Sequence, residues 1–209
     1  MTITEHQLRD LLDQRFHGVL LTGKHQENSQ ACAMELLSVA KGIPWTDNPE
    51  AVRSFDLRSI NDVRVDGVVR AQHLLPLLAA YADSMDWPVE QQARVVTRII
   101  LLTINRLISQ LPQLPSAVAQ KCRDAATLTE VIRAAEDTAK AAEDTSSARA
   151  AEAVRAAARA AEDADWAASS ARAAEATAWA AMVAAGDAAR QNVFIDICAL
   201  WMEAVTNES

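Results

Sequence analysis

The sequence is poor in glycine, proline and aromatic residues. Its 209 residues include 5 Gly, 6 Pro, 3 Phe, 5 Trp and 1 Tyr. All-β domains depend on tight turns that use Gly and Pro, whereas long helices need few of either. No segment shows the alternation of apolar and polar residues that is typical of a strand. The sequence therefore predicts an all-α fold in which helices pack as a bundle.

Cysteine is also scarce, and basic residues are outnumbered by acidic ones. The three cysteines are far apart and lack Cys-x-x-Cys spacing, which predicts free, packed thiols in a reducing cytosol. A net charge of −8 argues against binding to nucleic acid or to an anionic membrane surface. The N-terminus has no apolar segment typical of a signal peptide, and the apolar stretch Val95 to Ile108 is too short to span a bilayer. We therefore expect a cytoplasmic protein.

Residues 1–130 have an ordinary composition, which predicts a globular helical domain. Thr4 and Gln7 form a capping-box pattern at the start of one helix, and Gly42 supplies a residue that ends another. Pro76 either kinks a helix or begins a separate one. The expected helices are Thr4 to Phe16, Ser29 to Lys41, one within Asp66 to Asp83, and Pro88 to about Gln110.

Residues 131–190 are dominated by alanine, with 28 Ala in 60 residues. Two sets of alanines repeat every seven residues, from Ala150 to Ala185 and from Ala153 to Ala188. Such spacing predicts the seam of a left-handed supercoil, in which a partner helix comes close but little apolar area is buried. We expect long, closely packed antiparallel helices that fold back on the first domain or project from it. Residues 191–209 are expected to form a closing amphipathic helix.

One stretch carries a resemblance to a known family. Cys32 and Glu35 lie in a Cys-x-x-Glu helix, Gly42 to Pro49 read Gly-x-Pro-Trp-x-Asp-x-Pro, and Leu74 to Leu77 read Leu-Leu-Pro-Leu. These motifs, with the Ala-rich repeat and the short final helix, resemble an uncharacterised family from bacteria and their phages. The resemblance implies an architecture and a phage or mobile-element setting, and it implies no activity.

Motifs for catalysis, cofactors and metals are missing from the sequence. There is no Gly-rich phosphate loop, no His-Glu-x-x-His and no Gly-x-Ser-x-Gly. The four histidines do not have the spacing of metal ligands. Cys32 and Glu35 share a helix face, but a thiol and one carboxylate without a histidine make a poor nucleophile pair. We therefore expect no catalytic residue, no cofactor and no metal site.

Glu35 is the most informative polar residue, because it lies in an otherwise apolar helix. The helix is followed by a loop that contains Trp45 and Asp47. Our preferred interpretation is that Glu35 hydrogen-bonds this loop and fixes the connection. The alternative is a small-ligand pocket formed by Lys24, His25, Glu35, Trp45 and Asp47.

Two tryptophans, Trp166 and Trp179, flank the alanine seam. A large ring among alanines either fills a gap against a neighbouring helix or anchors a binding partner. Both residues are therefore candidates for partner binding, although packing is the preferred interpretation.

These observations favour a non-enzymatic helical protein that binds a protein partner or a second copy of itself. In a phage setting, such a protein could inhibit a component of the host defence. The alternative is a protein that binds or sequesters a nucleotide-like anion between helices, with Arg94, Arg98 and Arg133 as candidate ligands assisted by helix N-termini. An enzyme of unrecognised type is the least favoured reading.

Overall fold

The computed structural model describes residues 3–26, 30–47, 57–84, 86–110, 116–127, 129–130, 133 and 190–207. Within these residues every regular element is a helix, so the predicted all-α fold is confirmed. The elements are α1 (Glu5–Phe16), α2 (Ala33–Ala40), α3 (Arg58–Asn61), α4 (Gly67–Ser84), α5 (Val89–Arg106), the 3-10 turn η2 (Ile108–Gln110), α6 (Ser116–Asp124) and a C-terminal helix at 190–206.

The predicted alanine seam and both Trp166 and Trp179 lie outside the described residues. Among the helices that the structure does describe, none is long and apolar enough to cross a membrane.

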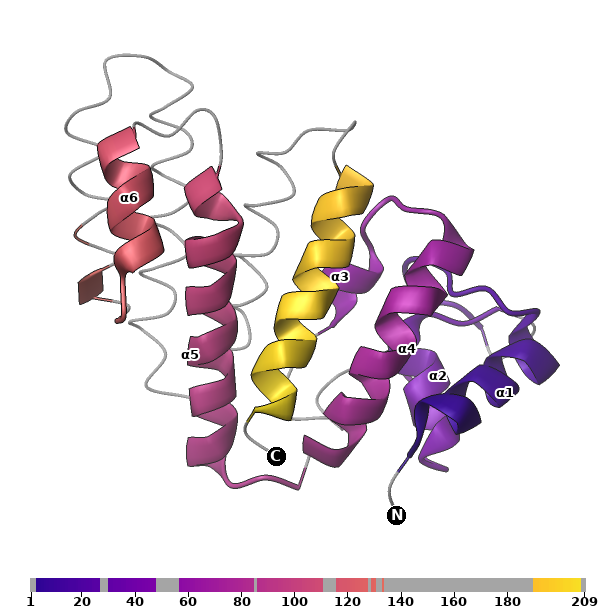
Figure 1. Ribbon diagram of the computed structural model, residues 1–209. Coiled ribbons are helices and arrows are strands. Elements are labelled where there is room, and N and C mark those ends of the chain that lie inside the picture. The colour runs from indigo at the N-terminus through magenta and orange to yellow at the C-terminus, as the bar shows by residue number, and fades with distance from the viewer. Residues whose placement is uncertain are drawn as a thin grey trace.

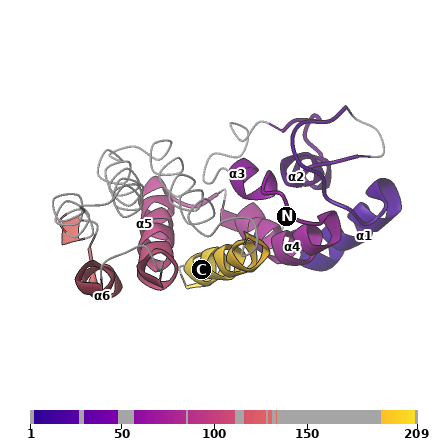
Figure 2. The ribbon, with the colours of Figure 1, turned by 90° about the horizontal axis from the view of Figure 1, so that it is seen from above.

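The C-terminal helix lies between α4 and α5, although it comes last in the sequence (Figure 1). Seen from above, α4, the C-terminal helix, α5 and α6 follow one another in a row, with α1 beyond α4 (Figure 2). His73 of α4 contacts the Phe194 ring edge-on, with centroids 6.5 Å apart. On the other side, Arg106 of α5 forms an ion pair with Glu203. The last helix therefore joins the α1–α4 half of the fold to the α5–α6 half.

The core follows the apolar faces of these helices. On α1 the buried residues are Leu8, Leu12 and Phe16, which recur at helical spacing. The C-terminal helix buries Phe194, Ile197, Cys198, Trp201 and Val205. Adjacent rows on α5 are also buried, and they consist of Val95, Val96, Ile99, Ile100, Thr103 and Ile104. All of these apolar residues belong to one continuous cluster.

Helix α1 begins as the sequence predicts. The side chain of Thr4 accepts from the Gln7 amide at 3.2 Å, and the Gln7 side chain accepts from the Thr4 amide at 2.8 Å. The capping box is therefore complete, and these reciprocal bonds satisfy backbone donors at the start of the helix. The chain then leaves α1 through His17 and Gly18, both with positive φ.

Helix α2 begins at Ala33, so the predicted start at Ser29 is wrong. The Cys32 amide donates to the Glu35 carboxylate at 2.8 Å, and the Ala33 amide donates to Asn61 Oδ1 at 3.1 Å. The carbonyl of Ala31 accepts from the Leu21 amide instead of starting the helix. Glu35 lies within the helix and closes a local capping box with Cys32, while Asn61 and Leu21 come from other parts of the chain. Together these partners fix the first residue of α2.

Helices α4 and α5 settle two further expectations. Pro76 lies inside α4, so it does not begin a separate helix. Its neighbours Leu74, Leu75, Leu77 and Leu78 are all buried, and this packing outweighs the loss of one helical hydrogen bond. Helix α5 ends at Arg106, before the predicted end near Gln110, and the chain continues as η2.

The segment after α1 is held against the start of α4 by Arg70, which is only 3% exposed. Its guanidinium donates to the carbonyls of Leu20 at 2.6 Å, Val63 at 2.8 Å and Val65 at 3.0 Å. Burial lowers the pKa of Arg70, while the nearby carboxylate of Asp62 opposes this shift. The side chain therefore acts as a clip between the chain after α1 and the turn before α4, and so positions residues 21–26.

Candidate functional site

The residues that sequence analysis grouped around Glu35 do come together, and they converge on the loop 21–26. Glu35 is fully buried at the start of α2. Its Oε1 accepts from the His25 amide at 2.7 Å. Its Oε2 accepts from the Cys32 amide at 2.8 Å and lies 2.9 Å from His25 Nδ1. Because a carboxylate has no proton to give, Nδ1 carries the proton in this contact. The carboxylate thus holds the loop to the N-terminus of α2.

Trp45 holds the same loop from the opposite side of His25. Its Nε1 donates to the His25 carbonyl at 3.0 Å. The indole also packs against Phe16 of α1, with ring centroids 5.9 Å apart and planes tilted by 42°. Trp45 therefore joins three parts of the chain. Its hydrogen bond connects the 43–47 segment to loop 21–26, and its ring packs that segment against α1.

Asp47 makes the third contact between the 43–47 segment and the loop. Its carboxylate lies 3.5 Å from the ammonium of Lys24. The Lys24 side chain is 73% exposed, so water and salt screen this ion pair strongly. The pair adds little to stability, and it orients Lys24 toward the 43–47 segment.

Asn61 and Asp62 complete the cluster, and sequence analysis missed both. Asp62 Oδ1 accepts from the Gly23 amide at 2.7 Å. Asn61 Nδ2 donates to the Leu21 carbonyl at 3.0 Å, while its Oδ1 accepts from the Ala33 amide. The contacts span from 28 to 40 residues along the chain, so no local spacing signals them. The sequence offered one hint of their role, which is that the polar Asn61 directly follows the apolar Ile60.

The cluster contains a thiol, an imidazole and a carboxylate, but its thiol is held in the protonated form. Cys32 lies at the N-cap of α2, where the helix dipole normally lowers the pKa of a thiol. Here burial raises the pKa of Cys32 to about 12, and the negative charge of Glu35 adds to the rise. The thiolate needed for nucleophilic attack is therefore disfavoured.

No group of three or more His, Cys, Asp or Glu side chains that could hold a metal ion occurs in the part of the chain that the structure describes. Within the cluster, the carboxylate of Glu35 is already occupied by three donors from the protein. The polar groups of the cluster thus bond one another, and this is the arrangement expected of a structural latch.

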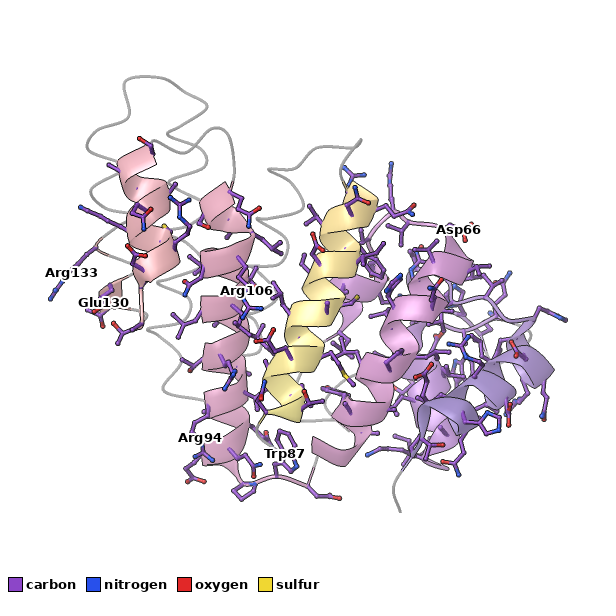
Figure 3. The ribbon with its side chains drawn as sticks, in the orientation of Figure 1. Asp66, Trp87, Arg94, Arg106, Glu130 and Arg133 are labelled. Carbon is purple, nitrogen blue, oxygen red and sulfur yellow. The ribbon has the colours of Figure 1, made fainter. Side chains whose placement is uncertain are left out.

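The three arginines proposed as anion ligands are not brought together. Arg94 is exposed near the start of α5, and Arg98 lies one turn further along the same helix. Arg133 is exposed beyond α6, well separated from Arg94 (Figure 3). The structure therefore does not gather these three side chains at one place, and the binding of a nucleotide-like anion stays a prediction.

Comparison of the chain with protein-family models, with curated proteins and with solved structures found no match. The resemblance stated from the Cys-x-x-Glu and Gly-x-Pro-Trp-x-Asp-x-Pro motifs stays a prediction. What the structure adds is a shared role for the motif residues, because Glu35, Trp45 and Asp47 all contact His25 or Lys24.

Proposed function

We propose that this chain is a non-enzymatic binding protein that presents loop 21–26 to a protein partner or to a second copy of itself. The observation that supports the proposal is a contrast within the loop. Its backbone is anchored at Leu21, Gly23 and His25 by side chains of Asn61, Asp62, Glu35 and Trp45. Between these anchors, Thr22 and Lys24 are exposed.

A loop held in this way is suited to recognition. Binding normally costs the conformational entropy of the loop that becomes ordered. Here internal hydrogen bonds have already ordered the backbone, so an approaching surface meets side chains in fixed positions. Loops that carry exposed residues on a rigid scaffold are a common location for binding sites.

The same contacts argue against a catalytic use of the cluster. Glu35 has no free oxygen facing solvent, because the residue is fully buried and both oxygens accept hydrogen bonds from the chain. Cys32 is also buried, with a raised pKa. Under the phage setting implied by the resemblance, we propose a component of host defence as the partner.

The test combines oligomeric state with partner capture. Light scattering measures self-association of the full chain, and an affinity-tagged chain captures partners from a lysate of the host. The decisive variant is Thr22→Ala with Lys24→Ala, which changes the exposed face of the loop and keeps the hydrogen bonds that anchor its backbone, while removing only the screened ion pair with Asp47. Gln72→Ala with Thr97→Ala serves as the matched control, because both residues are exposed on other helices.

The proposal predicts that the wild type forms a dimer or captures a protein, and that this binding is lost in the loop variant and kept in the control variant. The two variants should have equal thermal stability. A strict monomer that captures nothing would contradict it. So would a captured protein whose amount is the same with the loop variant as with the wild type, because loop 21–26 would then play no part in binding.

A further inference from the structure

We propose that loop 21–26 is a strap that opens as one cooperative unit, independently of the rest of the core, and that its opening uncovers Cys32. The inference concerns a conformational device within the fold and does not depend on the identity of any partner. It rests on three features of the loop: what holds it, how the contacts are linked, and how Cys32 is connected to it.

The strap is held mainly by polar contacts. Four of its six residues are already exposed, namely Thr22, Gly23, Lys24 and Gln26. Opening of the strap therefore exposes little additional apolar surface to water. Cys198, by contrast, lies in the C-terminal helix beside the fully buried Phe194, Ile197 and Trp201. Segments with few buried apolar contacts open locally at a lower free energy than the global unfolding of the core.

Three contacts of the strap, with two different segments, meet at a single residue. His25 uses its amide and its ring to reach Glu35, and it uses its carbonyl to reach Trp45. Glu35 and Trp45 come from different segments, so each stabilises the loop conformation that the other requires. If His25 moves away, the buried carboxylate of Glu35 loses two of its three donors at once. Partial release is therefore unfavourable, and the strap opens as a whole.

Cys32 is linked to this arrangement through its backbone. Its amide shares Glu35 Oε2 with the His25 ring, and the preceding Ala31 pairs with Leu21 at the start of the strap. Cys32 is 3% exposed when the strap is closed. Once the strap is open, the backbone at Ala31 loses its partner Leu21 and the Glu35 carboxylate that holds Cys32 loses the His25 contacts, so we expect the start of α2 to loosen and the thiol to become accessible.

The three cysteines provide the experiment. The native full chain is treated with iodoacetamide, and mass spectrometry of peptides measures the labelling rate of each thiol separately. All three cysteines are buried, so each reacts through an open state. We expect Cys32 to react at least about tenfold faster than Cys198, because strap opening is more frequent than global unfolding.

Two variants test the linkage. Trp45→Phe removes the indole donor and keeps an aromatic ring against Phe16, while Glu35→Gln replaces an acceptor by an amide. Each removes a contact that both the open strap and the globally unfolded chain lack, so each is expected to raise the Cys32 and Cys198 rates together, by about five- to tenfold for Trp45→Phe and by more for Glu35→Gln. Arg106→Ala is the contrasting variant, because it removes a contact that the open strap keeps and global unfolding breaks. It is expected to raise the Cys198 rate, by up to about fivefold, and to leave the Cys32 rate unchanged.

Equal labelling rates for Cys32 and Cys198 in the wild type would overturn the proposal, because Cys32 would then be exposed only by global unfolding. A Cys32 rate that rises by the same factor as the Cys198 rate in Arg106→Ala would overturn it as well, because both thiols would then react through global unfolding. If Glu35→Gln does not fold, Trp45→Phe still decides the question, and an unchanged Cys32 rate in that variant counts against the linkage.

Discussion

Arg106 and Glu203 form a two-pronged ion pair that connects α5 to the C-terminal helix. Arg106 Nη1 lies 2.6 Å from Glu203 Oε2, and Nη2 lies 3.0 Å from Oε1. The two side chains are 52% and 34% exposed, so solvent screens the attraction. The pair therefore fixes the register between the two helices more than it stabilises them, and the buried Phe194, Ile197 and Trp201 provide most of the stabilisation.

The first prediction concerns this pair. A double-mutant cycle with Arg106→Ala and Glu203→Ala should give a coupling free energy of no more than about 1 kcal/mol, because the pair is largely solvated. The coupling should decrease when the salt concentration rises from 0.05 to about 1 M, where the screening length falls to about 3 Å. Chemical denaturation of the four proteins measures it. A coupling that is insensitive to salt would show that the pair is buried in solution.

The second prediction compares two glutamates that serve similar local roles. Glu35→Gln should lower the free energy of unfolding by about 2–4 kcal/mol, because an amide group would place an N–H against donors in a fully buried site. Glu130 also accepts from two backbone amides, those of Ala126 and Thr127, but it is exposed. Glu130→Gln should therefore lower it by about 0.5 kcal/mol or less. Urea denaturation followed by circular dichroism measures both. Equal losses would mean that burial of Glu35 is not what makes it important.

Local sequence patterns predicted the helices whose ends are determined locally. The start of α1 follows from Thr4 and Gln7, which are three residues apart and cap each other. The end of α2 follows from Gly42, whose φ of 67° suits glycine. In both cases the residues that decide the outcome are neighbours in the chain, so the sequence contains the whole cause.

Features that depend on distant residues could not be predicted. The start of α2 is set in part by Asn61 and Leu21, which lie far from it in sequence and add to the local capping contact between Cys32 and Glu35. The cluster around Glu35 was recognised in part, because Trp45 and Asp47 lie close behind it on the chain. Its other half was missed, since Asn61 and Asp62 reach it only after the chain has folded back. The sequence indicated that Glu35, a polar residue in an apolar helix, needs a hydrogen-bond partner. It did not indicate that the backbone and ring of His25 would be that partner.

The third prediction concerns a glycine that allows close packing. A Cβ at Gly67 would overlap with Val19 Cγ1 and lie 2.8 Å from the carbonyl oxygen of Leu20. Gly67→Ala should therefore lower the free energy of unfolding by about 2–3 kcal/mol, although alanine is the better helix former. The Arg70 clip would be displaced at the same time, because it donates to the same carbonyl.

The control for Gly67 is Gly42, where a Cβ would meet nothing within 4 Å. Its positive φ still disfavours alanine, so Gly42→Ala should cost about 1 kcal/mol. Thermal unfolding of the two variants separates steric overlap from backbone strain. If Gly67→Ala proves no less stable than Gly42→Ala, the close approach of the 19–20 segment to α4 is incorrect.

The last prediction follows from the buried thiol of Cys32. Burial raises its pKa from 9.0 to about 12, so the folded state keeps the proton over a range of pH in which the unfolded state releases it. The thiol therefore stabilises the fold below pH 9, and this contribution is lost as the pH rises from 9 toward 12. The loss amounts to at most about 1.4 kcal/mol per pH unit.

Cys32→Ser removes the titrating group and keeps a residue suited to the N-cap. The unfolding free energies of the wild type and the variant, measured from pH 8 to 11, should diverge above pH 9, with the wild type falling more steeply. Parallel curves would mean that Cys32 is accessible to solvent in the folded chain, because only a buried thiol resists ionisation in this range.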